Sequence, residues 1–302
     1  MKKNLLSMAL VLVAACSIVF TGCKDSSNGG ETTQETNDAG ATSENKDNAG
    51  GNSQTTVDKL KDVFTNFDQR DTWDTTAKKI ELSNEDVVIE KEGTYILSGT
   101  LDDGQIYVNV DSEEKVQLVL NGVDITCSDS AAIFVENADK VSITLVEGTE
   151  NILSDGGDKD SSNADGCIYS KDDLSINGSG KLVVNGNVNN GIDCNNDIKI
   201  VGGTIEVTAV NNGIKAKQSI SIKDGDISVK ADDAIKASSN SDDTVGSFYM
   251  EGGNLDLVAA DDSITATVSI IIAGGKITSD AEGKNTNCDG TEKIAEGCLI
   301  KK

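Results

Sequence analysis

The sequence predicts an all-β fold, a right-handed parallel β-helix with about 22 residues per coil, because one pattern recurs along residues 165–281. Each repeat has an acidic or amide turn, a small residue followed by isoleucine, a short strand, a glycine pair and a second strand. Successive repeats begin 25, 22, 21 and 29 residues apart, measured between Gly166, Gly191, Gly213, Ala234 and Ser263. Self-similarity at a period of roughly 20–50 residues is typical of solenoids, arrays and propellers.

Apolar residues take the same positions in successive repeats and alternate with polar ones, as in Ile205-Glu206-Val207-Thr208. This alternation is strand periodicity. A strand this short cannot bury its apolar face alone, but copies stacked about 4.8 Å apart shield one another. The expected columns are Ile168, Ile192, Ile214, Ile235 and Ile264; Ile176, Ile200, Ile222 and Ile272; and Leu182, Ile205, Ile227, Leu255 and Ile277.

Glycines mark the corners of these coils. Those at 202–203, 225, 252–253 and 274–275 predict corners that need a positive φ. Less regular coils of the same solenoid are expected upstream, at 95–97, 106–108, 116–120, 133–135 and 141–145. A propeller is the alternative, but its blades need about 40 residues and aromatic signatures that this sequence lacks.

The N-terminal region predicts an exported lipoprotein. Residues 1–22 have the form of a signal peptide, with a basic start and an apolar stretch too short to span a membrane. Cys23 is the expected lipid attachment site, which would anchor the protein to the outer face of the bacterial cell membrane. An ordinary secretory signal is the alternative. Residues 23–56 predict a disordered tether, residues 57–78 an N-terminal cap with helical spacing at 57–67, and residues 79–302 the β-helix.

Charge and composition limit the possible functions. The chain has 26 Lys and Arg against 51 Asp and Glu, a net charge of −25, which disfavours nucleic acid and favours cations. There is no histidine, so His-based triads and His-ligated zinc are excluded. Cys288 and Cys298 are close enough in sequence to close a short loop, and their disulfide is left open. We expect a monomer.

Several segments resemble one bacterial family. They are residues 93–101 (GTYILSGTL), 116–123 (VQLVLNGV), 148–151 (GTEN) and 170–180 (SKDDLSINGSG), followed by the Gly-Gly-strand repeats. Together they resemble the pectate-lyase-like β-helix carbohydrate-binding domains, over roughly residues 64–281. The resemblance implies calcium binding and attachment to acidic pectic polysaccharide without established lyase activity. Two turns depart from the family's Asp-Asp-Gly or Asp-Gly pattern by carrying Asn-Asn-Gly, which implies weaker ion binding.

The turn column is the strongest candidate for a metal site. Stacked coils would bring its side chains about 5 Å apart. Ca²⁺ takes six to eight oxygen ligands from carboxylates, amides, carbonyls and water. For the Asn turns we favour a plain corner ladder, whereas the paired acids on neighbouring coils favour calcium because they repel unless neutralised. The predicted ligands are Asp165, Asn190, Asn212, Asp232, Asp233, Asp261 and Asp262.

Lys215 and Lys236 are expected to pair with carboxylates of a ligand. A lyase would need a strong base, normally arginine, beside calcium, and the only arginine, Arg70, lies outside the repeats. Aromatic residues are 3% of the chain, so we expect polar, cation-bridged recognition rather than ring stacking. We therefore predict a non-catalytic surface lipoprotein that binds acidic, pectin-like polysaccharide through Ca²⁺. The alternatives are a pectin-active lyase or hydrolase, and a structural adhesin or scaffold stiffened by calcium.

Overall fold

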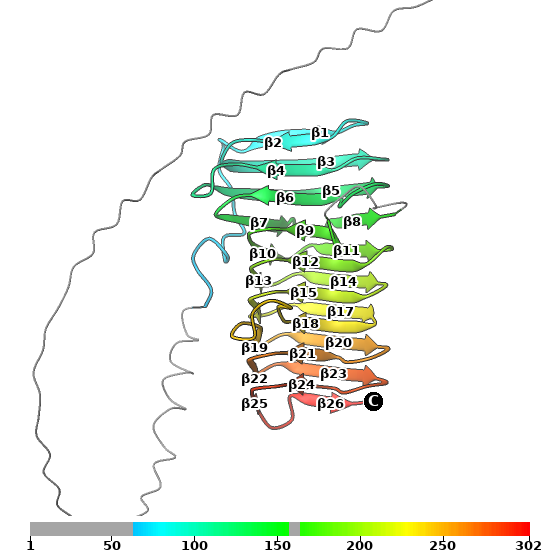
Figure 1. Cartoon of the computed structure of the whole chain (residues 1–302). Coiled ribbons are helices and arrows are strands. Elements are labelled where there is room, and N and C mark those ends of the chain that lie inside the picture. Colours follow the sequence, from blue (N-terminus) through cyan, green and yellow to red (C-terminus); the bar gives the residue numbers. More distant parts are fainter. Residues whose placement is uncertain (1–62, 157–163) are drawn as a thin grey trace, which may run out of the picture. The chain divides into compact units, whose positions relative to one another are not determined.

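The computed structural model describes residues 63–156 and 164–302, which form a parallel β-helix (Figure 1). Each complete coil contributes one strand to each of three faces, and successive strands of a face pair in parallel. The described residues contain no helix. The predicted all-β parallel β-helix is confirmed.

The strands divide among the three faces as follows. Face 1 consists of β7 (Lys140–Leu145), β10 (Asp173–Gly178), β13 (Asp197–Ile200), β16 (Ser219–Ile222), β19 (Ser247–Met250), β22 (Ser269–Ile272) and β25 (Thr291–Ile294). Face 2 consists of β8 (Glu150–Asp155), β11 (Lys181–Gly186), β14 (Thr204–Ala209), β17 (Asp226–Ala231), β20 (Asn254–Ala259), β23 (Lys276–Ala281) and β26 (Leu299–Lys301). Face 3 consists of β2 (Val87–Ile89), β4 (Ile106–Asn109), β6 (Ile133–Asn137), β9 (Gly166–Ser170), β12 (Asn190–Cys194), β15 (Asn212–Ala216), β18 (Asp233–Ala237), β21 (Ile264–Ala266) and β24 (Asn287–Cys288).

The first coils are built from longer strands. β1 (Lys78–Leu82) pairs with β3 (Gly93–Leu101), and β3 pairs with β5 (Lys115–Cys127). The first half of β5 pairs with β7 and its second half with β8, so this one strand belongs to both face 1 and face 2.

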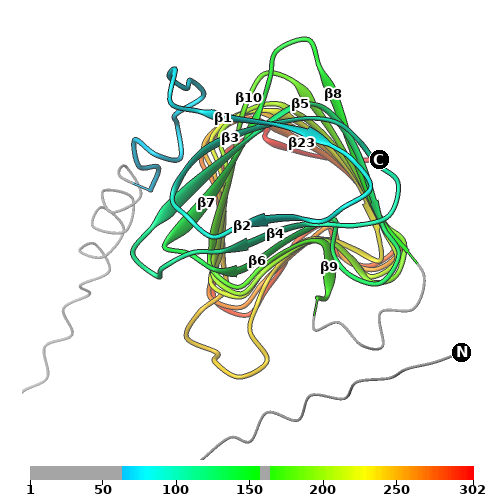
Figure 2. The ribbon, with the colours of Figure 1, turned by 90° about the horizontal axis from the view of Figure 1, so that it is seen from above.

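The strand register reproduces the predicted apolar columns. Ile214 pairs with Ile192 and with Ile235, at separations of 22 and 21 residues. Ile235 pairs with Ile264, 29 residues later, because residues 238–246 form a loop between β18 and β19 (Figure 2). The first step differs from the prediction, since Asn190 pairs with Gly166, 24 residues away.

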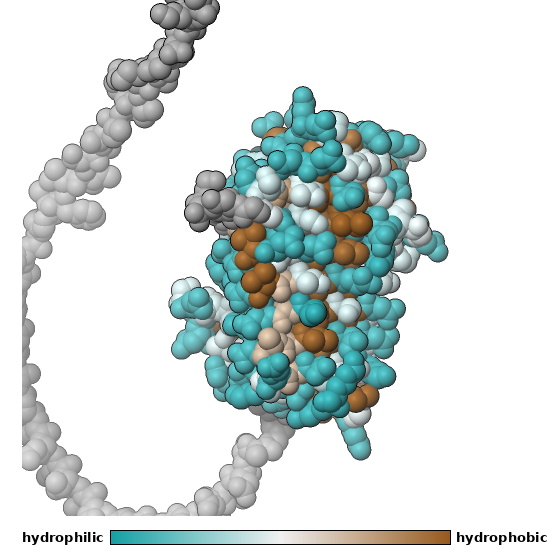
Figure 3. All heavy atoms as spheres, turned by 90° about the vertical axis from the view of Figure 1, so that its right-hand side faces the viewer, coloured by the Kyte–Doolittle hydropathy of each residue, from teal (hydrophilic) through white to brown (hydrophobic). Residues whose placement is uncertain are grey.

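The core runs through the interior of the coils and is aliphatic apart from a few larger side chains. Phe248 is fully buried and pairs in register with Ile220 and Ile270. Burial of one such side chain contributes on the order of 1.5–3 kcal/mol. The outer surface in Figure 3 is mostly hydrophilic, with apolar side chains gathered in rows.

Each of the four predicted glycine corners contains one glycine with a positive φ, which confirms the prediction. Gly203, Gly225, Gly253 and Gly275 have φ values of +100°, +126°, +88° and +82°. A Cβ atom built on Gly253 would lie 2.7 Å from the carbonyl oxygen of Gly225 on the coil before it. These corners therefore need glycine both for the left-handed backbone and for the close stacking of coils.

Residues 63–77, which we call the strap, precede β1 and lie outside the solenoid beside β7 (Figure 2). They contain turns but no helix, and they contact the side of the solenoid through hydrogen bonds to β5, β7 and β10. The helical cap expected at 57–78 is therefore not found in its described part. The predicted signal peptide, the lipid site Cys23 and the tether lie outside the described residues.

The two C-terminal cysteines are free thiols. Cys288 pairs in register with Ala266 on face 3, whereas Cys298 is buried in the core cluster. The disulfide that the sequence left open is not formed.

Within the described residues, no helix is long and apolar enough to cross a membrane.

Candidate functional site

The candidate site lies along the corner where the strands of face 3 begin. Asn190, Asn212, Asp233 and Asp262 occupy this corner on successive coils, and each is at most 7% exposed. The backbone N–H of Asn212 donates to Asn190 Oδ1 at 3.0 Å, and that of Asp262 donates to Asp233 Oδ1 at 3.2 Å. Asn212 pairs with Asp233 in register. The predicted stack of turn residues is therefore present across these four coils.

The asparagine half of the stack is a hydrogen-bonded ladder. Asn212 Nδ2 donates to Asn190 Oδ1 at 2.7 Å, and Asn190 Nδ2 donates to Asp193 Oδ2 at 2.6 Å. Beside them, Asn211 Nδ2 donates to Asn189 Oδ1 at 2.9 Å. Both ends of the Asn190 amide are occupied, as the ladder alternative predicts, so we drop Asn190 from the expected metal ligands. Asn212 Oδ1 is buried and has no hydrogen-bond partner within the described residues.

The acidic half of the stack brings three carboxylates together. One carboxylate oxygen from each of Asp233, Asp261 and Asp262 lies within 4.8 Å of the other two. Asp233 and Asp262 are buried, and Asp261 is exposed beside them. Asp262 also accepts hydrogen bonds from the Lys284 backbone N–H at 2.7 Å and from Asn287 Nδ2 at 2.6 Å. Clustered carboxylate oxygens are ligands that a hard cation such as Ca²⁺ prefers.

The neighbouring carboxylates raise the pKa of Asp261 above its usual value. The charge of Asp262 raises the pKa of Asp261, and burial and the charges of Asp233 and Asp232 raise it further. Like charges at this spacing repel, and protons or a bound cation would relieve that repulsion.

The two predicted ligand-binding lysines lie beside the stack on the outer surface of face 3. Lys215 and Lys236 pair in register, so they occupy adjacent coils. Lys215 Nζ lies 3.2 Å from Asp193 Oδ2, and Lys236 Nζ lies 2.7 Å from Asp233 Oδ2. Burial raises the pKa of Asp193, although Lys215 and Asn190 act in the opposite direction. Both lysines therefore lie beside the carboxylate cluster, and each forms an ion pair with an aspartate of this chain.

Two predicted ligands lie outside the carboxylate cluster. The pairing of Asn190 with Gly166 places Asp165 level with Asn189 instead, and Asp165 is exposed. Asp232 is exposed as well, and it affects the cluster through its charge on Asp261. The metal-site prediction therefore narrows to Asp233, Asp261 and Asp262, with Asn212 as a neighbouring oxygen.

Sequence reasoning missed Asp193, which joins the asparagine ladder to Lys215. Asp193 pairs in register with Tyr169, and the same outward column continues to Phe134 and Tyr107 on earlier coils. The three rings meet edge to face, with centroids 5.5 and 5.2 Å apart. The signal for this column was available, because each of its members directly follows the isoleucine near the start of its face 3 strand.

Known proteins are similar to this chain over most of its length. A family model described as a carbohydrate-binding domain-containing protein matches residues 83–299. A carbohydrate-binding domain-containing protein of Acetivibrio thermocellus is 43% identical over 228 residues, which are 74% of this chain and 80% of that protein. A solved structure, described as the polysaccharide lyase-like protein from C. thermocellum in a gadolinium derivative, has a TM-score of 0.71 and 38% identity. The match covers 75% of this chain and 99% of that one.

Proposed function

Because the chain belongs to the carbohydrate-binding domain family, we propose that its solenoid binds an acidic, pectin-like polysaccharide at the bacterial cell surface without cleaving it. One observation carries the acidic specificity, namely the carboxylate cluster of Asp233, Asp261 and Asp262 beside Lys215 and Lys236. A protein with a net charge of −25 repels a polyanion unless cations intervene. Calcium bound at this cluster and the ammonium groups of Lys215 and Lys236 provide these positive charges.

The cluster has the chemistry of a calcium site. Asp233, Asp261 and Asp262 supply carboxylate oxygens from two coils, and Ca²⁺ completes six to eight ligands with carbonyl groups, water or ligand oxygens. The related structure described as a gadolinium derivative fits this assignment, since both ions prefer oxygen ligands. A bound Ca²⁺ supplies a positive charge that a uronate carboxylate could share.

Cation binding also changes what the lysines can do. Lys236 is now paired with Asp233 at 2.7 Å. A cation on Asp233 takes over the neutralisation of that carboxylate and leaves the Lys236 ammonium group available for a carboxylate of the polysaccharide. Lys215 on the adjacent coil extends the same positive row. Binding of calcium and of the polysaccharide would thus be coupled.

A lyase or hydrolase is the second candidate, favoured by the relative described as polysaccharide lyase-like. Arg70 lies in the strap, where its guanidinium group stacks on Phe67 with the Cζ atom 4.9 Å from the ring centroid. One carboxylate oxygen of each acid in the cluster lies within 4.8 Å of the others, slightly closer than the roughly 5–5.5 Å carboxyl separation of retaining glycosidases and well short of the 6.5–9.5 Å of inverting ones. Acids that hold calcium are also poorly suited to act as acid and base. We therefore favour binding without catalysis.

A structural adhesin or scaffold is the remaining alternative, because the cluster joins two neighbouring coils and calcium there would stiffen the solenoid. The predicted lipid anchor at Cys23 places the domain on the outer face of the membrane in either case.

A pull-down separates these functions. The full chain is mixed with insoluble polygalacturonate in millimolar calcium or in EGTA, and the supernatant is assayed for unsaturated and reducing ends. Calcium-dependent retention without product supports the proposal, and product in the supernatant establishes the enzyme. Absence of retention in both buffers rejects pectin binding. Asp261→Asn should lose the calcium-dependent part of the retention, whereas Asp232→Asn, which changes an exposed acid on the preceding coil, serves as the matched control.

A further inference from the structure

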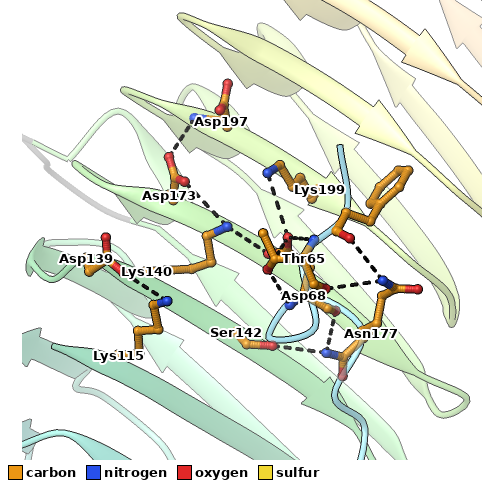
Figure 4. Close-up of polar contacts among 12 residues, drawn as sticks. Thr65, Asp68, Lys115, Asp139, Lys140, Ser142, Asp173, Asn177, Asp197 and Lys199 are labelled. Carbon is orange, nitrogen blue, oxygen red and sulfur yellow. Dashed lines mark hydrogen bonds and ion pairs between the residues drawn. The ribbon is translucent and has the colours of Figure 1, made fainter. Parts of the chain in front are cut away.

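A set of polar contacts joins the strap to face 1 (Figure 4). Lys140 Nζ lies 2.8 Å from one carboxylate oxygen of Asp68, and Lys199 Nζ lies 3.7 Å from the other. The side chains of Gln117 and Asn177 donate hydrogen bonds of 2.9–3.4 Å to backbone carbonyl groups of the strap. In each of these contacts the sheet supplies the donor and the strap supplies the acceptor.

Asp68 is the centre of this contact. It is 0% exposed and is the only buried residue of the strap. No described strap residue belongs to the hydrophobic core, and the apolar side chains of Val63, Phe64 and Phe67 are only half-buried. A carboxylate and a row of carbonyl oxygens hold the segment against ammonium and amide donors of the sheet. An acidic saccharide offers the same groups, since uronate carboxylates and sugar oxygens are acceptors.

The strap matches this surface only in part. Ser175 Oγ and Asn177 Oδ1, both on β10, are buried and have no hydrogen-bond partner within the described residues. Both residues are at most 1% exposed. Sugar hydroxyl groups both donate and accept, so they could satisfy the two oxygens that the strap leaves unpaired.

We propose that Lys140, Lys199, Gln117 and Asn177 form a binding site for a carboxylate-bearing saccharide, and that the strap occupies it with Asp68 in place of a uronate. This inference rests on the proposed function, because it names a second place where the acidic polysaccharide binds. The site differs from the cluster on face 3 in needing no calcium. The strap then acts as an internal competitor that the polysaccharide displaces.

The sheet can lose the strap without leaving a lone buried charge. Asp173 Oδ2 lies 3.5 Å from Lys140 Nζ, so this ammonium group retains an acidic partner when Asp68 leaves. The other strap contacts are near the surface: Lys223 donates to the exposed Gln69, and Lys115 lies 5.6 Å from the centroid of the Phe67 ring. Displacement therefore requires the replacement of one buried carboxylate and of the strap carbonyl groups that accept from Gln117 and Asn177.

Trp73 reports on this displacement. It is the only tryptophan of the chain, it lies in the strap, and it is 40% exposed. A hollow of about 250 Å³ separates it from the turns that follow β7 and β10. Release of the strap would change its emission. The experiment titrates the full chain in EGTA with a galacturonate oligomer, and in parallel with a neutral galactose oligomer, while Trp73 fluorescence is recorded.

The galacturonate oligomer should produce a saturable change and the galactose oligomer none. Asp68→Asn should shift the ligand-free emission towards the bound value and tighten apparent binding by about tenfold or more, because a competent state of about 1–10% becomes dominant. Asp71→Asn changes an exposed acid of the same strap and should leave the ligand-free emission and the apparent affinity unchanged. Adding Lys199→Met to Asp68→Asn should remove the gained affinity, whereas adding Lys276→Met on face 2 should not. Circular dichroism confirms that each variant is folded.

Two results would overturn the inference. In the first, wild type shows calcium-dependent retention on polygalacturonate, but Asp68→Asn binds the oligomer no more tightly in EGTA. The strap is then a structural element and the function proposed for face 3 stands. In the second, neither wild type nor Asp68→Asn binds galacturonate in any buffer, which rejects both proposals. A saturable fluorescence change in EGTA, with retention on polygalacturonate that does not increase when calcium is added, supports the face 1 site alone.

Discussion

Calcium should raise the melting temperature of this protein through the Asp233, Asp261 and Asp262 cluster. Three carboxylates at an extracellular site suggest a Kd of about 10⁻⁴–10⁻³ M. At about 10 mM calcium, binding to the folded state then adds about 1.4–2.7 kcal/mol to the free energy of unfolding. For a domain of this size, that gain corresponds to a rise in Tm of about 3–11 °C. Thermal unfolding of the full chain, followed by circular dichroism in EGTA and in calcium, measures it.

Asp261→Asn separates a calcium site from a general salt effect. The substitution removes one ligand and also the repulsion that raises the pKa of Asp261. We expect a higher Tm than wild type in EGTA and a much smaller rise with calcium. Asp232→Asn also removes one exposed acid but leaves the cluster intact, so it should keep most of the rise. An equal calcium response in wild type and Asp261→Asn would refute the assignment.

Three further outcomes follow from the same structure. The folded-state pKa of Asp261 is raised, so its ionisation disfavours the folded state as the pH rises. Protonation of Asp261 at lower pH competes with calcium. The calcium-induced rise in Tm should therefore shrink as the pH falls through that pKa. Phe248→Ala should lower the free energy of unfolding by about 3–5 kcal/mol in urea titrations, whereas Val258→Ala, at a 38% exposed position, should change it by less than about 1 kcal/mol. Gly253→Ala should lower the free energy of unfolding in urea more than Gly122→Ala does. Both glycines have a positive φ, but only the Cβ atom added at Gly253 would lie against a backbone atom, 2.7 Å from the Gly225 carbonyl oxygen.

The repeats made most of the solenoid predictable. Alternation along each strand determines which side chains face inward, and a constant period places Ile192, Ile214 and Ile235 in one column. Turn residues aligned by type gave the correct stack from Asn190 to Asp262 as well. The alignment was one residue off at Asp165, because hydrogen-bond register rather than turn composition determines which residues are level.

The strap could not be predicted in this way. Apolar residues at helical spacing favoured a helix at 57–67, but its described part contains none. The contacts that position the strap join residues far apart in the sequence: the Asn177 side chain and the Asp68 carbonyl group are 109 positions apart, and Lys223 and Gln69 are 154 apart. No local period encodes such pairs, and Asp68 in isolation looks like any exposed acid. The chain of contacts from Asn190 through Asp193 to Lys215 was missed because it joins a turn residue to two outward-facing strand residues, and the sequence was aligned one column at a time.

Binding of a polyanion by this chain should depend steeply on polymer length. Each lysine assigned to the ligand is already paired with an internal acid: Lys215 with Asp193, Lys236 with Asp233, and both Lys140 and Lys199 with Asp68. A single uronate must replace such a partner, so its net gain in free energy is small. A chain that spans adjacent coils replaces several partners at once, and each later contact forms at a high effective concentration. Galacturonic acid itself should compete poorly with polygalacturonate in the pull-down, and oligomers should compete better as they lengthen. If galacturonic acid competes as strongly as long oligomers at the same concentration of carboxylate groups, the lysines act independently and this prediction is wrong.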